Sequence, residues 1–431
     1  MPNGGLPPRP PSYDKMVALV LQGGGALGSY QAGVYEIIAS SEYAPDWVAG
    51  ISIGAINAAI IAGNAPSDRV TRLKTFWEEI TSPTAWWPAG LDGPLARAQR
   101  KASAGLALLC GQPGFFTPRA PSDWLSIASP TSYYDTSVLR STLERLVDFD
   151  RINSVKDTRL SVGAVNVRTG RLVYFDSATM AIHPEHIMAS AALPPGFPSI
   201  EIDGEHYWDG GLVSNTPLQY VLDYYPRRSR LCFQVDLFQA YGELPTNLDE
   251  VAERDKEIRY SSRTRVGTEA FRERHEVRHA INELFEMLPG ELKSTAQAKR
   301  LYNFGCVTTM DIVQLIFRSF EPLGASKDFE FSRSTMLERW QQGARDAVAT
   351  LRASPWIAPV PPEVGVRTFD VIHDILVQEL GDKGRSGSAR PRATDRAFFD
   401  LMRSHLSQGP APRSAEANAL AARLRRGQIV R

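Results

Sequence analysis

The chain has 431 residues, with 48 Lys and Arg against 48 Asp and Glu, 43% hydrophobic residues and three cysteines. This composition excludes a disordered tail, a collagen and a small disulfide scaffold, and a net charge of zero gives no overall attraction to nucleic acid or anionic membranes. At about 100–200 residues per domain, the length predicts two or three domains, or one large α/β domain with a helical addition.

The cysteines and the apolar runs indicate where in the cell the protein is expected and whether it needs a metal or cofactor. Cys110, Cys232 and Cys306 lie far apart, with no CxxC pair and no Cys/His cluster, so neither a disulfide framework nor a zinc site is expected. The Pro- and Gly-rich residues 1–15 are expected to be flexible and lack a signal-peptide pattern, and no apolar run reaches the roughly 18 residues of a membrane span. We therefore expect a cytoplasmic protein that needs no metal or organic cofactor and binds no nucleic acid.

The first elements alternate between buried strands and helices. MVALVLQ at 16–22 is a continuous apolar run typical of a strand buried on both faces. It leads into the glycine loop 23–28 and a helix from residue 29. Residues 47–49 then lead into GISIG at 50–54 and an apolar helix that ends near residue 63.

Residues 81–134 break this alternation and are rich in Pro, Gly and aromatic residues, which indicates an insertion near the site. Two interpretations stay open: a lipid-facing lid or acyl channel, or an ordinary hydrophobic subcore. The aromatic side chains concerned are Trp86, Trp87, Phe115, Phe116 and Trp124.

Regular elements resume after the insertion. A helix is predicted at 137–147, and two strands flank residues 168–170. The α/β pattern continues to about residue 240, so the first domain is placed at 16–240. Residues 241–382 read as a mainly helical extension. The tail, 383–431, has eleven Lys and Arg against three Asp and Glu. For this basic tail we favour a solvated, partly flexible segment over one that contacts anionic membranes.

GISIG fits the pattern G-x-S-x-G, in which a serine occupies a sharp turn between a strand and a helix. Gly50 and Gly54 relieve crowding, and Ser52 is the candidate nucleophile. Alone the pattern also fits a simple tight turn. Its position between a predicted strand and an Ala-rich helix favours the catalytic interpretation.

The upstream loop GGGALG also follows a buried strand and opens a helix, so its backbone N–H groups are candidates for an oxyanion hole. The candidate donors are those of Gly23, Gly24, Gly25 and Ala26, with Gly28 closing the motif. The spacing matches neither a dinucleotide fingerprint nor a phosphate loop.

A serine nucleophile needs a base, and the contexts of His183, His186 and His206 do not mark any of them as one. Asp209, followed by Gly210 and Gly211, is predicted at a strand end next to a glycine turn, where a carboxylate can approach the serine. By itself DGG is an ordinary turn signal.

Together these motifs resemble the patatin-like phospholipase family, whose members use a Ser-Asp dyad. The matching segments are the glycine loop 23–28, Ser52 within 50–54, ASAALPP at 189–195 and Asp209 within DGGLVSNTP, and the likeness covers roughly residues 16–238. It implies a three-layer α/β/α sandwich with a mostly helical C-terminal extension. The family's loop usually carries Arg or Lys where this chain has Leu27, so backbone donors must act alone or an arginine elsewhere must help.

The resemblance implies a lipid acyl hydrolase, like a phospholipase A or lysophospholipase, in which Asp209 activates Ser52 and an acyl-enzyme forms. A short-chain or hydroxyacyl esterase or thioesterase is the alternative within enzymes, and a non-catalytic scaffold that binds a metabolic enzyme is the alternative outside them. The expected partner is a lipid or acyl-ester substrate. Peripheral membrane contact, and a homo-oligomer or metabolic-enzyme partner bound through the extension, stay open.

Overall fold

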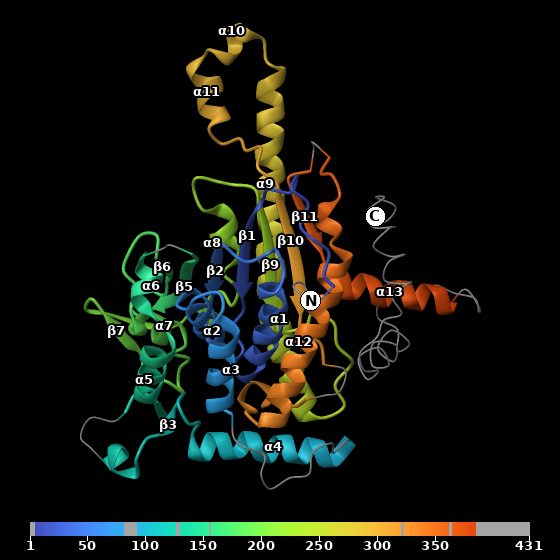
Figure 1. The fold of residues 1–431 in the computed structure, drawn as a ribbon. Helices are drawn as coiled ribbons and strands as arrows, with labels where there is room; N and C mark the ends of the chain where they lie inside the picture. The colour runs from blue at the N-terminus through green and yellow to red at the C-terminus, as the bar shows by residue number, and fades with distance from the viewer. Residues whose placement is uncertain are drawn as a thin grey trace.

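The computed structural model describes residues 5–81, 93–125, 130–154, 157–319, 323–361 and 364–384. Within these ranges nine strands form one sheet in the order β11-β10-β9-β1-β2-β5-β8-β7, with β6 also paired to β5 (Figure 1). The strands are β1 Met16–Leu21, β2 Trp47–Gly50, β5 Arg159–Asn166, β6 Leu172–Asp176, β7 Ile200–Ile202, β8 Glu205–Asp209, β9 Arg230–Asp236, β10 Met310–Ile316 and β11 Val366–Phe369. A small ribbon pairs β3 Thr117–Pro118 with β4 Tyr134–Asp135.

The central strands are parallel and buried on both faces, as their continuous apolar sequences predict. β1 pairs with β2 on one side and with β9 on the other, both in parallel. Beyond β5 the sheet becomes antiparallel, since β5 pairs with β6 and β8 in that sense. The strands predicted on either side of residues 168–170 are therefore confirmed as a hairpin.

Helices cover both faces of the sheet, which gives the three-layer α/β/α arrangement. On one face α1 Ser29–Ala39, α2 Ile53–Ala62, α3 Arg69–Glu79 and α12 Arg333–Ala353 share a core with the odd-numbered residues of β1. On the other face α8 Leu218–Asp223 and α9 Leu248–Met287 pack on Ala18 and Val20. The alternation of side chains along each strand divides the core in this way.

The remaining helices lie around this core. They are η1 Gly25–Gly28, α4 Gly93–Cys110, η2 Pro121–Leu125, α5 Ser137–Leu146, α6 Phe149–Ser154, α7 Pro184–Ser190, η3 Gly210–Leu212, α10 Gly290–Lys293, α11 Ala296–Tyr302, η4 Lys327–Phe329, η5 Pro355–Ile357 and α13 Val371–Gly384. In Figure 1, α10 and α11 extend beyond one end of the sheet and α4 crosses the other end. None of the helices in the described ranges combines the length and the apolar character needed to span a membrane.

Two features differ from the sequence expectations. The sheet does not end near residue 240, because β10 and β11 from the C-terminal half add to it in parallel next to β9. The aromatic insertion, for which no regular element was predicted, contains the helix α4. Trp86, Trp87 and residues 385–431 of the tail lie outside the described residues.

Candidate active site

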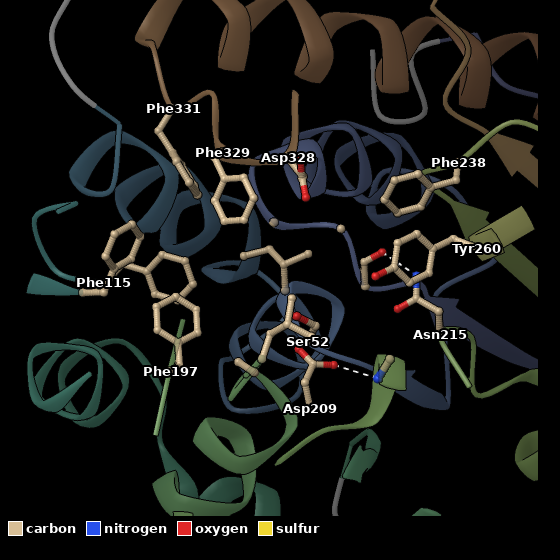
Figure 2. A pocket seen from close by; sticks show the side chains of 18 residues that line it. Ser52, Phe115, Phe197, Asp209, Asn215, Phe238, Tyr260, Asp328, Phe329 and Phe331 are labelled. Carbon is tan, nitrogen blue, oxygen red and sulfur yellow. Dashed lines mark hydrogen bonds between the residues drawn. The ribbon is translucent and has the colours of Figure 1, made fainter. Parts of the chain in front are cut away.

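Ser52 occupies the turn between β2 and α2. Its backbone has φ 57° and ψ −127°, a conformation that non-glycine residues rarely adopt and that is often found at functional sites. The glycines on either side make the turn possible: a Cβ on Gly50 would collide with the carbonyl of Gly54, and one on Gly54 with the carbonyl of Leu21. The Ser52 N–H donates to Ser190 Oγ at 3.1 Å. This turn holds the serine hydroxyl at the start of α2 and in the lining of a pocket (Figure 2).

Asp209 ends β8, and its carboxylate lies against the serine. The Gly211 N–H donates to its Oδ1 at 2.7 Å, and the neighbouring Ser52 side chain also stabilises the charged carboxylate. The side chain is 1% exposed. Burial raises the pKa of Asp209 from 3.8 to about 7, against the opposing effects of Ser52 and of the Gly211 N–H. A carboxyl group with such a pKa suits proton transfer near neutral pH.

Histidine does not take part in this arrangement among the described residues. No histidine is found in the described lining of the pocket, which includes Ser52 and Asp209. His186 packs edge-on against Phe175, and His206 lies near Ser199 Oγ at 3.2 Å. Nor do the described residues contain a cluster of His, Cys, Asp or Glu that would hold a metal ion. The carboxyl groups in the described lining of the pocket are those of Asp209 and Asp328.

The glycine loop lines the same pocket as Asp209 and is held by Asn215. The Asn215 side-chain amide donates to the Gly23 carbonyl at 2.8 Å, and the Gly23 N–H donates to the Asn215 carbonyl at 3.1 Å. The second bond occupies the Gly23 N–H, so the candidate oxyanion donors narrow to Gly24, Gly25 and Ala26. Leu27 is fully buried in the apolar core, which places its side chain away from the pocket.

Aromatic side chains from distant segments line the rest of the pocket. Phe115, Phe197 and Phe331 form one wall, with ring centroids 5.9 Å apart for Phe115 and Phe197 and 6.1 Å apart for Phe115 and Phe331 (Figure 2). On the other side the ring of Phe238 lies 4.7 Å from that of Tyr260 of α9, with the two ring planes tilted by 34°. The structure thus brings Ser52, Asp209 and the glycine loop together in a cleft with largely apolar walls.

Other residues predicted from the sequence lie near Ser52 and Asp209 or in the pocket lining. Gly210 and Gly211 form η3 behind Asp209, and Ser190 of the ASAALPP segment links Ser52 to β5, since its Oγ donates to the Gly163 carbonyl at 2.7 Å. Phe115 and Phe116 line the pocket. Trp124 is 47% exposed and packs near Tyr133.

Several residues that line the pocket were not among the site residues predicted from the sequence. They are Asn215, Phe197, Phe238, Tyr260, Asp328, Phe329 and Phe331. Asn215 lies within the DGGLVSNTP motif, so its proximity to Asp209 in sequence was a usable signal. The residues from 238 onward carry no local motif, because only the fold brings them to the pocket.

Comparisons with known proteins identify the family of the chain. A profile described as patatin-like phospholipase matches residues 19–222, and a second, described as patatin phospholipase, matches residues 258–363. The chain belongs to the patatin-like phospholipase family and has its three-layer α/β/α fold. Membership of this family identifies it as a lipid acyl hydrolase. A search of curated proteins found no match.

Among solved structures, VipD from Legionella pneumophila is 13% identical, with 96% of this chain and 88% of VipD covered and a TM-score of 0.35. The ExoU–SpcU complex from Pseudomonas aeruginosa gives 14% identity, 97% and 90% coverage and a TM-score of 0.27. Human GIVD cytosolic phospholipase A2 gives 11% identity, 51% and 43% coverage and a TM-score of 0.28. These distant likenesses carry no argument about the substrate.

Proposed function

We propose that the protein hydrolyses lipid acyl esters through a Ser52–Asp209 dyad and an acyl-enzyme. The observation that carries the proposal is the position of Ser52 beside the buried Asp209 carboxylate, within a pocket whose described lining contains no histidine. A hydroxyl at a tight turn becomes a useful nucleophile when an adjacent base removes its proton. Asp209 is the candidate for that base.

The proposed reaction has two halves. In the first, Asp209 takes the Ser52 proton as the serine oxygen attacks the ester carbonyl, and the N–H groups of Gly24, Gly25 and Ala26 stabilise the oxyanion. The tetrahedral intermediate collapses, the bond to the alcohol oxygen breaks, and Asp209 gives its proton to the leaving alcohol. In the second, Asp209 takes a proton from water, which attacks the acyl-serine, and the acid is released as Ser52 regains a proton.

The walls of the pocket support an apolar acyl group as the substrate's reactive end. Rings of Phe115, Phe197 and Phe331 lie on one side of Ser52, and burial of a hydrocarbon chain against them contributes about 0.8 kcal/mol for each CH2 group. We propose that this wall contacts the acyl chain. The leaving alcohol then faces the side formed by Asn215, Phe238 and Tyr260.

A hydrolysis panel tests this function. Purified wild-type protein would be assayed with p-nitrophenyl butyrate, p-nitrophenyl palmitate and phosphatidylcholine, beside Ser52→Ala and Asp209→Asn. Ser40→Ala and Asp255→Asn, at exposed positions, are the matched controls. We expect both dyad variants to lose activity while the controls keep it. Full activity of either dyad variant refutes the dyad, and much faster hydrolysis of butyrate favours a short-chain esterase.

A further inference from the structure

The C-terminal half supplies a buried arginine that holds the glycine loop. Arg339 lies on α12 and is 3% exposed. Its Nη1 donates to the carbonyl of Ala26 at 3.1 Å and to that of Glu330 at 3.1 Å, and its Nη2 donates to the carbonyl of Lys327 at 3.0 Å. One guanidinium group therefore joins the glycine loop to the segment 327–330.

The chemistry of arginine explains why this residue type suits the position. A guanidinium presents several N–H donors in a rigid planar fork and stays charged when buried. A buried charge must be compensated by polar groups. Here three backbone carbonyls accept from it, and the Glu330 carboxylate lies 3.9 Å from Nη2. A lysine has one ammonium nitrogen on a flexible stem and does not reproduce this fork.

A second contact between the same two segments lies next to the first. Gly25 has φ +55°, and a Cβ at this position would collide with the carbonyl of Asp328. The loop therefore packs directly against backbone of the C-terminal half. Lys256 of α9 holds Asp328 in turn, because its Nζ lies 2.8 Å from Asp328 Oδ1 and 2.7 Å from the Ala325 carbonyl.

Close packing of α12 against α1 sets the position of Arg339. A Cβ on Gly343 of α12 would collide with the carbonyl of Tyr30 on α1, and one on Gly33 of α1 with the carbonyl of Trp340. The Tyr30 hydroxyl also donates to Asp346 at 2.8 Å. The glycines allow the two helix backbones to approach closely, so α12 presents the guanidinium to the loop from a rigid support.

We propose that Arg339 is a positioning residue for the oxyanion loop: its hydrogen bond to the Ala26 carbonyl, together with the packing of Gly25 on Asp328, keeps the loop's N–H donors aimed at the developing oxyanion. This inference rests on the proposed function of Ser52. It places a positive charge beside the loop from outside the glycine motif, where Leu27 supplies none. The C-terminal half is thereby a part of the active site.

Arg339→Lys tests the proposal, with Arg333→Lys as the matched control. Both arginines lie on α12 and donate to backbone carbonyls, but Arg333 contacts Glu78 and Thr81 at the end of α3. In Arg339→Lys we expect kcat for p-nitrophenyl esters to fall by about 10- to 100-fold with KM within about twofold, as for a weakened oxyanion hole. Arg333→Lys should stay near the wild-type values.

Inhibitors distinguish a role in positioning the oxyanion donors from a role in stabilising the fold alone. A long-chain trifluoromethyl ketone forms a tetrahedral oxyanion when serine attacks it, and the corresponding methyl ketone binds without doing so to a comparable extent. We expect the inhibition constant of the first to rise about tenfold or more in Arg339→Lys, because the oxyanion donors are misaligned. The inhibition constant of the methyl ketone should stay within about twofold of its wild-type value.

The outcomes separate the two proposals. If wild-type protein is neither inhibited by the trifluoromethyl ketone nor active on esters, the proposed function is wrong. If wild type is active and Arg339→Lys matches it in kcat and in inhibition, only the positioning role is wrong. Should Arg339→Lys not fold, Lys256→Met decides by the same criteria, since its partly exposed side chain holds the segment that packs on Gly25, through Asp328 and the Ala325 carbonyl.

Discussion

Replacing Asp209 by Asn should abolish activity and at the same time stabilise the folded protein at neutral and alkaline pH. The carboxylate is buried, and its pKa rises from 3.8 to about 7 on folding. In the unfolded chain this carboxyl group therefore loses its proton at a much lower pH than in the folded chain. An asparagine keeps an oxygen that can accept from the Gly211 N–H, and it carries no charge that must be buried.

The sign and size of the difference in stability between Asp209→Asn and wild type follow from the linkage between proton binding and folding. Between pH 4 and 7 the folded state holds a proton on Asp209 that the unfolded state has lost, so the free energy of unfolding falls as pH rises. A shift from 3.8 to about 7 corresponds to about 4 kcal/mol at its full extent. The stability advantage of Asp209→Asn should therefore grow from pH 4 to pH 7 and stay constant above it.

Equilibrium denaturation in urea at pH 4.5, 6 and 8 measures this difference. The other buried carboxyl groups are common to both proteins, so they cancel in the comparison. A difference between variant and wild type that does not change with pH, or that favours the wild type increasingly as pH rises, would show that the Asp209 carboxyl group is not held in a desolvated site.

Three further predictions concern the reaction. Ester hydrolysis at limiting substrate should rise with pH and level off above about 7, because Asp209 must be ionised to accept a proton; a rate that falls over this range contradicts its role as base. Gly25→Ala should lower kcat about 10²- to 10³-fold, because its Cβ would displace the loop from Asp328, whereas Gly267→Ala, with open space around it, should leave kcat unchanged. Phe197→Ala should raise KM more for palmitate than for butyrate esters; an equal effect on both esters argues against an acyl-binding wall.

The sequence predicts the central part of this site well because its signals are local. A strand followed by G-x-S-x-G must place a serine in a tight turn whatever the rest of the fold does. The buried strands β1 and β2 are also predictable from local sequence, because each appears as a continuous apolar run. The DGG turn is less informative alone, and only its order relative to the other motifs singled out Asp209.

The parts that the sequence does not reveal depend on tertiary contacts. The short apolar run of β10 lies in a region of charged helical sequence, which hides it from prediction. Its place in the sheet comes from its pairing with β9. The sequence around Arg339 does not assign it a role at the site, because an arginine on an amphipathic helix normally faces water. Its importance comes from the crossing of α1 and α12, which no local pattern encodes.

The most direct test of the central claim is to identify the residue that carries the acyl group during turnover. Wild-type protein mixed with p-nitrophenyl palmitate would be quenched in acid within the first turnovers, digested, and analysed by peptide mass spectrometry. We predict a palmitoyl group on Ser52, with none in Ser52→Ala and much slower accumulation in Asp209→Asn. Hydrolysis that proceeds without acylation of Ser52, or with the acyl group on a different residue, would contradict the account.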